Sequence, residues 1–222
     1  MTSGSNSTPS GDIRIDLLLI ADLIEPGSRV LDVGCGDGSL LHHLAQTKKA
    51  DGRGIELSQA GVNACVAHGL SVVQGDADKD LANYPTASFD YAVLSQTLQQ
   101  VRHPRDVLTE LLRIGRMAVI SIPNFGHWKV RLILGLFGRM PVTEALNRPW
   151  YDTPNSHFCT IKDFAILCAE LGIRIDRHIS IDKQGRRMPI VSDGPFANLF
   201  SEQGVFLLSR PTGNSSPAPG AG

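Results

Sequence analysis

The stretch RVLDVGCGDGSLL, residues 29–41, decides the fold. Its first five residues form a short apolar run typical of a buried strand, and residues 39–46 have the periodicity of a helix. Between them Gly34, Gly36 and Gly38 form a G-x-G-x-G turn. Glycine lacks a Cβ, so the backbone can turn sharply here and approach a ligand closely. The spacing differs from the G-x-G-x-x-G of dinucleotide-binding folds.

The rest of the chain repeats this alternation of strand and helix. Strands are expected at 29–33, 53–57, 70–74, 89–95, 117–122, 173–181 and 204–209. Helices are expected at 13–24, at 39–46, from Ser58 to about Ala67, at 104–114, and after a capping box that begins at Thr160. The pattern predicts an α/β fold, a doubly wound and mostly parallel seven-stranded sheet. Ligands of such sheets bind beyond the carboxyl ends of the strands.

Composition bounds the function before any motif is considered. The 222 residues are 42% hydrophobic and 19% charged, which is typical of a globular chain. Lys and Arg number 21 and Asp and Glu 22, giving a net charge of -1. A binder of nucleic acid needs a basic face, so nucleic-acid partners are disfavoured. The four cysteines have neither C-x-x-C nor zinc spacing, so no metal site is expected.

The ends and the middle of the chain differ from the alternating pattern. Residues 1–12 are mostly Ser, Thr, Gly, Asn and Pro, and residues 211–222 have no large apolar side chain, so we expect both to be disordered tails of a single domain over 13–210. No apolar run reaches the ~20 residues that span a bilayer. The N-terminus also lacks the apolar core of a signal peptide. These features predict a cytoplasmic protein without a membrane partner. An aromatic-rich insertion occupies 126–159.

Acidic side chains around the glycine turn indicate the charge of the ligand. Asp32 and Asp37 would repel a pyrophosphate, whereas the ammonium and sulfonium groups of S-adenosylmethionine would be attracted. A carboxylate at Glu56 can accept both hydrogen bonds of a ribose diol, and Asp76 one from an adenine amino group. The predicted cofactor contacts are Asp32, Gly34, Cys35, Gly36, Gly38, Glu56, Leu57, Asp76, Ala77, Ser95 and Gln96. Simpler interpretations stay open: a tight turn at the glycines, a helix cap at Asp37, a turn residue at Asp76.

At this point a family resemblance is evident. The chain is similar to class I S-adenosylmethionine-dependent methyltransferases in the segments VLDVGCGDG, GIELS, VVQGDAD and FDYAVLSQTLQQV. More closely, it resembles the methionine-biosynthesis MetW family along nearly all of residues 12–210, for example in IPNFGHWKVR and RPWYDTPNSHFCTIKDF. The resemblance implies a methyltransferase fold, S-adenosylmethionine or S-adenosylhomocysteine as ligand, and a hetero-complex with homoserine O-acyltransferase. It implies a partner or regulator of that enzyme.

The residues leave the question of catalysis open. A catalytic base would have to come from His127, Tyr151 or His157, and each has a structural alternative. The segment Ser95–Leu98 lacks the Asn/Asp-Pro-Pro-aromatic turn of amino-directed methyltransferases of DNA and protein. No Pro-Cys nucleophile for cytosine chemistry occurs there either. Cys35 is interpreted as a small filler.

The insertion combines aromatic side chains with basic ones, which is the composition of interface anchors. Both tryptophans of the chain lie in it, and Trp128, Phe137, Trp150 and Tyr151 form the expected docking surface. A lid over the cofactor, an amphipathic helix on a membrane surface and a core helix are the alternatives.

Three functions remain open from the sequence. The first is a ligand-binding associate or regulator of the acyltransferase. The second is an active small-molecule methyltransferase with an unknown acceptor. The third is a scaffold whose pocket has become vestigial.

Overall fold

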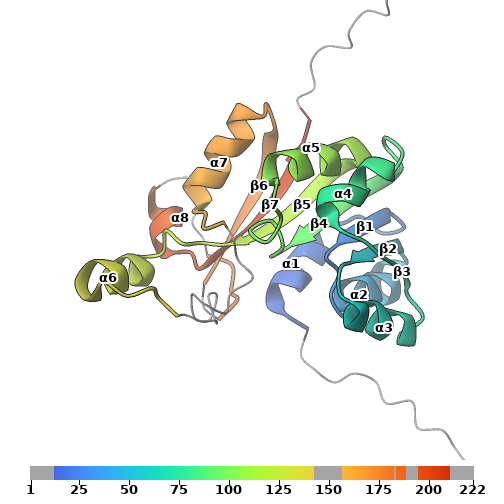
Figure 1. Cartoon of the computed structure of the whole chain (residues 1–222), viewed down its shortest axis with the longest axis horizontal. Coiled ribbons are helices and arrows are strands. Elements are labelled where there is room, and N and C mark those ends of the chain that lie inside the picture. Colours follow the sequence, from blue (N-terminus) through green and yellow to red (C-terminus); the bar gives the residue numbers. More distant parts are fainter. Residues whose placement is uncertain (1–12, 143–156, 183, 189–194, 211–222) are drawn as a thin grey trace, which may run out of the picture.

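The computed structural model describes residues 13–142, 157–182, 184–188 and 195–210. One seven-stranded sheet runs through it in the order β3-β2-β1-β4-β5-β7-β6 (Figure 1). The strands are β1 (Arg29–Val33), β2 (Asp51–Glu56), β3 (Ser71–Gln74), β4 (Phe89–Ser95), β5 (Gly115–Pro123), β6 (Arg174–Ile181) and β7 (Gln203–Ser209). The strand order reverses between β1 and β4, which is where sheets of this kind bind ligands.

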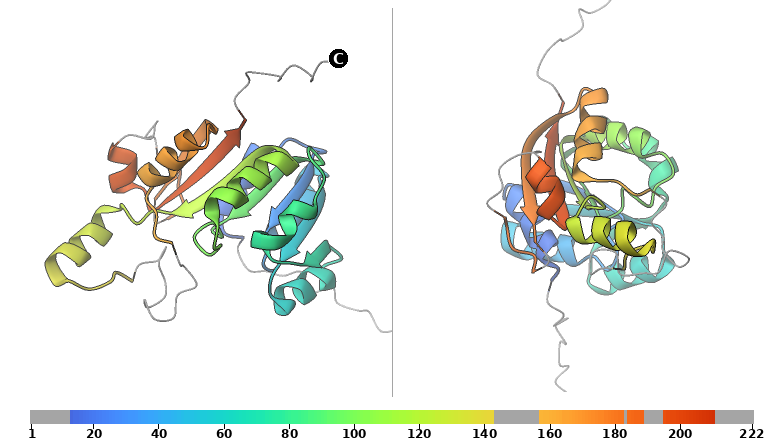
Figure 2. Two further views of the ribbon diagram at one scale, coloured as in Figure 1. Left: turned by 45° about the horizontal axis from the view of Figure 1, so that its top comes forward. Right: turned by 90° about the vertical axis from the view of Figure 1, so that its left-hand side faces the viewer.

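The helices connect these strands and cover the sheet on both faces (Figure 2). They are α1 (Ile15–Leu23), α2 (Ser39–Lys48), α3 (Gln59–Ala67), α4 (Ala77–Asp80), the 3-10 turn η1 (Leu81–Asn83), α5 (Pro104–Ile114), α6 (Trp128–Phe137), α7 (Ile161–Glu170) and α8 (Pro195–Phe200).

Alternation along the strands divides the core into two layers. Val30 belongs to a buried cluster with α1 and α2, whereas its neighbour Leu31 belongs to a cluster with α5 and α7. Successive side chains of a strand point to opposite faces, so an apolar run such as residues 29–33 must be covered on both sides. This double cover holds the carboxyl ends of β1 and β4 in place beneath the site.

The expected sheet and its seven strands are confirmed, with strand boundaries within two residues of those predicted. β7 runs antiparallel to both β5 and β6, which is why the sheet is only mostly parallel. Local capping also follows the prediction: Ser58 accepts a hydrogen bond from Gly61, and Thr160 and Asp163 form a reciprocal capping box. The short elements α4, η1 and α8 were not predicted, because three to six residues are too few for a helical period to show.

The described part of the insertion is a helix that stands away from the sheet. In Figures 1 and 2, α6 projects from the end of the molecule that carries α8, on the side opposite α3. Val130 is the buried residue of this helix, while Leu136 and Phe137 are each 69% exposed. The core-helix interpretation of residues 127–140 is therefore wrong. Trp150 and Tyr151 lie outside the described residues. Within the described ranges, no helix has the length and apolarity needed to cross a membrane.

Candidate functional site

The glycine loop after β1 follows a path that favours glycine. Gly34, Gly36 and Gly38 have φ values of 73°, 58° and 79°, in the left-handed region where a Cβ causes strain. A Cβ on Gly34 would also lie 2.7 Å from the Thr97 hydroxyl oxygen. The Gly34 amide donates to the Ile55 carbonyl of β2 at 2.8 Å, which ties the loop to the neighbouring strand. The loop therefore has one defined shape at the carboxyl edge of the sheet.

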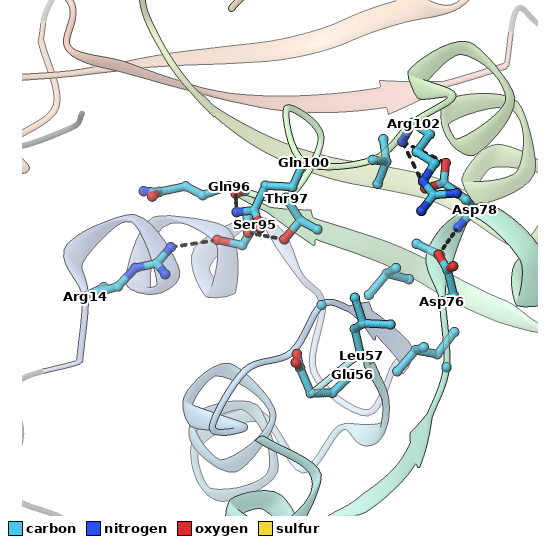
Figure 3. Close-up of a pocket in the computed structure, with 16 residues that line it drawn as sticks. Arg14, Glu56, Leu57, Asp76, Asp78, Ser95, Gln96, Thr97, Gln100 and Arg102 are labelled. Carbon is cyan, nitrogen blue, oxygen red and sulfur yellow. Dashed lines mark hydrogen bonds between the residues drawn. The ribbon is translucent and has the colours of Figure 1, made fainter. Parts of the chain in front are cut away.

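A cavity of about 470 Å³ lies beside this loop, between the carboxyl ends of β1, β2 and β4 and the segment after β3 (Figure 3). Its volume lies within the range of small-molecule sites. The predicted contacts that line it are Gly34, Glu56, Leu57, Asp76, Ala77, Ser95 and Gln96. Four loops that are distant in sequence thus meet at one cavity, as the topology predicts.

A second cavity of about 370 Å³ adjoins the first, since Arg14, Gly34 and Ser95 line both. Its lining includes three further predicted contacts, Asp32, Cys35 and Gly36. Gly38 lines neither of these two cavities. A Cβ at that position would collide with the side chains of Leu70 and Cys65, so Gly38 serves the packing of α3 against the loop.

The Glu56 carboxylate closes the site from the end of β2. One of its oxygens accepts a hydrogen bond from the Gly36 amide at 2.9 Å, and the other accepts one from the Ser58 amide at 2.9 Å. A carboxylate oxygen has more than one acceptor direction, so Glu56 can accept further hydrogen bonds from a diol in the cavity. The same group therefore shapes the glycine loop and offers acceptors to a ligand.

Asp32 is a buried carboxylate at the inner end of the second cavity. It is 2% exposed, and its Oδ1 has no hydrogen-bond partner among the described residues. Burial raises the pKa of this carboxyl, the charge of Arg14 opposes the shift, and the charges of Glu56 and Asp37 add to it, which together bring the pKa to about 7. An unpaired buried oxygen is costly unless a ligand satisfies it. A cationic donor is the group that would do so.

Arg14 is a residue of the candidate site that the sequence analysis missed. It precedes α1, lines both cavities, and pairs with Asp16 through two hydrogen bonds of 3.0 and 2.6 Å. Its guanidinium also donates to the Ser95 hydroxyl at 2.9 Å. The site is therefore not purely acidic, and a ligand that carries both an ammonium and a carboxylate suits it. One arginine near a polar tail has no motif spacing, and only the fold reveals its position.

Ser95 and Gln96 end β4 in a fixed conformation. Gln96 has a φ of 49°, which is unusual for a residue with a side chain. Its side-chain amide donates to Asp16 and to Gln203, both at 3.1 Å, and its backbone amide donates to the Ser121 hydroxyl. These contacts from α1, β5 and β7 hold the strained turn in place.

Asp76 caps the short helix after β3. Its carboxylate accepts a hydrogen bond from the Asp78 amide at 3.0 Å and lies 3.0 Å from the Lys79 ammonium. The hydrogen bond to Lys79 lowers the pKa of Asp76, so this carboxyl stays ionised. The turn interpretation therefore holds for part of the side chain, while the residue still lines the larger cavity. Asp37 makes local contacts too, since it accepts hydrogen bonds from the amide and hydroxyl of Ser39, although the N-cap position of α2 is Gly38.

The two candidate bases within the described residues lie apart from the two cavities. His127 precedes α6, is 5% exposed, and has its pKa lowered by burial and by the charge of Lys129. His157 is exposed, and its backbone amide donates to the Gln99 carbonyl at 3.0 Å. Neither histidine is among the residues that line the cavities. Tyr151 falls outside the described residues. Burial raises the pKa of the Cys35 thiol, which agrees with its interpretation as a filler.

Comparison with known proteins gives the relatives of the whole chain. The model of the family described as "Methionine biosynthesis protein MetW" matches residues 14–208. The chain is 33% identical over 208 residues to the "Bifunctional methionine biosynthesis protein MetXA/MetW" of Rhodopirellula baltica, covering 89% of this chain and 33% of that protein. It is 42% identical over 96 residues to a fatty-acid O-methyltransferase of Mycolicibacterium smegmatis, covering 40% of this chain and 34% of that protein. The chain spans about a third of the length of these two relatives.

Solved structures show the same fold at low sequence identity. An S-adenosylmethionine dependent methyltransferase from Mesorhizobium loti superposes with a TM-score of 0.64 at 17% identity, covering 90% of this chain and 99% of that one. A putative methyltransferase from Haloferax volcanii, solved in complex with the Trm112 methyltransferase activator, gives a TM-score of 0.63 at 16% identity and covers 90% of both chains. At such identities the likeness shows the class I methyltransferase fold.

Proposed function

Because the chain belongs to the methionine-biosynthesis MetW family, we propose that it binds S-adenosylmethionine or S-adenosylhomocysteine and associates with homoserine O-acyltransferase as a regulatory subunit. The family match and the Rhodopirellula relative support a role in methionine biosynthesis, and the solved neighbours show the methyltransferase fold. The nucleoside ligand and the acyltransferase partner are the steps that the proposal adds.

The observation that carries the ligand proposal is the pairing of opposite charges at one end of the site. The Asp32 carboxylate has an oxygen without a partner among the described residues, and Arg14 lines the same cavity. The amino-acid end of either nucleoside is a zwitterion, so Asp32 would receive its ammonium and Arg14 its carboxylate. A neutral nucleoside would offer no cation to the unpartnered oxygen of Asp32.

The remaining residues fit the rest of the ligand. Glu56 would accept hydrogen bonds from the ribose diol, and Asp76 one from the adenine amino group. A Cβ built on Gly36 meets nothing within 4 Å, so the backbone there borders open space into which a ligand can come close. When bound, S-adenosylmethionine supplies an electrophilic methyl group on sulfur. The chain's own residues would bind and orient this group, which is the larger part of what such transfers require of a protein.

A regulatory role agrees better with the site than catalysis that depends on a base. His127 and His157, the candidate bases within the described ranges, lie outside the cavity linings. The Rhodopirellula relative carries the names MetXA and MetW in one polypeptide, which supports an acyltransferase as the partner. Ligand occupancy would then report the end product of the pathway to the acyltransferase, through a coupling free energy between the two sites.

The decisive experiment is a titration of complex formation between the purified chain and the homoserine O-acyltransferase of the same genome, with and without S-adenosylhomocysteine. Calorimetry of the chain alone should show binding of S-adenosylhomocysteine and no binding of NADH. The partner affinity should then change when the ligand is saturating. An identical partner affinity in both states would remove the sensing role, and absence of nucleoside binding would remove the site.

An active small-molecule methyltransferase is the second candidate. It is favoured by the partial matches to O-methyltransferases, such as the fatty-acid enzyme, over 96 residues. Some acceptors need no catalytic base, so the site permits this chemistry. Transfer of a labelled methyl group to any member of a metabolite panel, abolished in a variant that does not bind the cofactor, would establish it. A vestigial pocket is disfavoured by the size of the main cavity.

A further inference from the structure

The α6 helix exposes apolar side chains on nearly every side. Its exposed apolar residues are Trp128, Leu132, Leu134, Leu136 and Phe137. At 100° per residue these positions are spread around the helix, not gathered on one stripe. The helix α8 lies at the same end of the molecule (Figure 2). Its Phe196 and Phe200 are 67% and 42% exposed, and their rings stack. We call these seven side chains the α6–α8 surface.

The base of this helix is rigidly built. Asn124 is 2% exposed, and its side-chain amide donates to the carbonyls of Asn198 and Ser201 at 2.9 and 2.7 Å. Its Oδ1 accepts from the Gly126 amide at 2.9 Å. Arg131 then donates to the Gly126 carbonyl at 2.6 Å. The start of α6 and the end of α8 are therefore held together by one buried side chain, which gives the projecting helix a fixed direction.

Such a helix gains little stability from its own sequence in water. A helix of 10 residues is shorter than the roughly 12–15 residues at which isolated helices become even marginally stable. A helix whose apolar residues are spread around most of its axis is normally buried. A lipid surface would cover one side and requires a charged opposite face, which α6 lacks. A protein groove that encloses the helix covers several sides at once.

The basic residues around α6 indicate the charge of the groove that would bind it. The described residues 128–142 include Lys129, Arg131 and Arg139 and no acidic residue. Basic side chains around an apolar anchor match a groove whose rim carries carboxylates. The Rhodopirellula relative holds a MetXA part and a MetW part in one chain, and fusion keeps two such parts at a high effective concentration.

We propose that the α6–α8 surface inserts into an apolar, acid-rimmed groove of the homoserine O-acyltransferase and is the site where the two proteins bind. The proposal rests on the partner named in the proposed function. It adds the surface, which lies at the opposite end of the sheet from α3 and does not use the residues of the cofactor site (Figure 1).

The test compares two variants of the full-length chain. In Leu136→Gln/Phe137→Gln, two strongly exposed apolar side chains of α6 become polar. In the control Val66→Gln, an apolar residue on α3 that is 59% exposed is changed in the same way. Binding to the purified acyltransferase is measured by calorimetry, and binding of S-adenosylhomocysteine is measured separately on each variant. We expect the α6 variant to bind the partner at least tenfold more weakly and the control to bind within twofold of the wild type, both with unchanged nucleoside affinity.

Charge is tested by Arg139→Glu against Arg116→Glu, an exposed arginine at the start of β5. The first variant should weaken binding and flatten its salt dependence, and the second should not. If the wild type fails to bind the acyltransferase, the proposed function itself fails. If the wild type binds and Leu136→Gln/Phe137→Gln binds equally well, the function stands and this surface is wrong.

The other occupants give distinct results, each of which overturns the proposal. Dimerisation of the wild-type chain by light scattering, lost in the α6 variant while partner binding persists, would assign the surface to a second copy. Co-sedimentation with phosphatidylcholine–phosphatidylglycerol vesicles, lost in the same variant with partner binding intact, would assign it to lipid. A large fall in melting temperature with unchanged partner binding would show that the surface stabilises the fold of this chain itself.

Discussion

The guanidinium of Arg14 donates a hydrogen bond to the Ser95 hydroxyl at 2.9 Å, although 81 residues separate the two in the chain. Arg14 also holds Asp16, which is 5% exposed, so the start of α1 is clamped to the carboxyl end of β4. The clamp lies where the two cavities meet. The Arg14 guanidinium therefore joins α1 to β4 and also borders the space that a ligand would occupy.

Replacing Arg14 tests this double role. Lysine keeps the charge but lacks the planar fork of separate nitrogens through which the guanidinium reaches Asp16 and Ser95. We expect Arg14→Lys to raise the Kd for S-adenosylhomocysteine by about tenfold, since charged hydrogen bonds contribute roughly 1.5–3 kcal/mol each. The Kd is measured by calorimetry. The matched control is Arg187→Lys, whose partner Asp22 also belongs to α1 but is exposed, so its effect on affinity should be negligible. Equal effects of the two would place Arg14 outside the binding site.

Glu56 joins the ligand site to the glycine loop. Glu56→Gln removes one charged acceptor, and its amide group would face either the Gly36 or the Ser58 amide as a donor. We expect a loss in nucleoside affinity of roughly 2 kcal/mol, about thirtyfold, together with a small loss of stability. Glu170→Gln, on a surface ion pair with Arg105, provides the comparison and should leave the affinity unchanged. An unaltered Kd in Glu56→Gln would mean that the ribose contact is misassigned.

Asp32 should make ligand binding depend on pH. Burial raises the pKa of this carboxyl to about 7, so at pH 6 most of the free protein holds it protonated. An ammonium ligand needs the ionised form, so binding at pH 6 must release a proton. The Kd should therefore fall up to about tenfold between pH 6.0 and 7.5. In Asp32→Asn the dependence should be nearly flat, and this variant also corrects for titration of the ligand's own amino group.

The same shift has a consequence for stability. The folded-state pKa of Asp32 lies above its ordinary value of 3.8, so the folded protein binds more protons than the unfolded one between about pH 4 and 7. The contribution of this group to the stability of the ligand-free chain therefore decreases as the pH rises through that window. Asp32→Asn should melt higher than the wild type at pH 8, with a smaller gain at pH 4.5. A lower melting temperature of Asp32→Asn at pH 8 would contradict the inference that the ionised Asp32 carboxylate lacks a partner in the ligand-free protein.

Two glycines separate the cost of backbone conformation from the cost of collision. Gly34 and Gly27 have nearly equal φ values of 73° and 74°, but a Cβ on Gly27 meets nothing within 4 Å, whereas one on Gly34 meets Thr97. Gly27→Ala should cost about 1 kcal/mol, the strain of a left-handed alanine. Gly34→Ala should cost about 2–4 kcal/mol in denaturant unfolding, since a clash is added. Adding Thr97→Ala should recover part of the difference, and no recovery would show that the side-chain contact is unimportant.

The strands and the larger helices could be predicted because their signals are local. The apolar run of residues 29–33, the Pro104 start of α5 and the capping box at Thr160 each act within one or two turns of chain. The candidate site could be predicted in part for a related reason. In a parallel sheet the loops after successive strands share one edge, so Gly34, Glu56 and Ser95 had to converge there once the topology was known.

The sequence by itself therefore determined the strands of the sheet and the acidic residues around the glycine turn, since periodicity and loop position are properties of short segments. Only the tertiary structure decided that Arg14 belongs to the site, that Gly38 packs against α3 and that α6 stands exposed. The reason is that side-chain contacts across 81 residues, as between Arg14 and Ser95, depend on how whole elements pack. An apolar helix has the same sequence pattern whether it packs against the core of its own chain or against another protein.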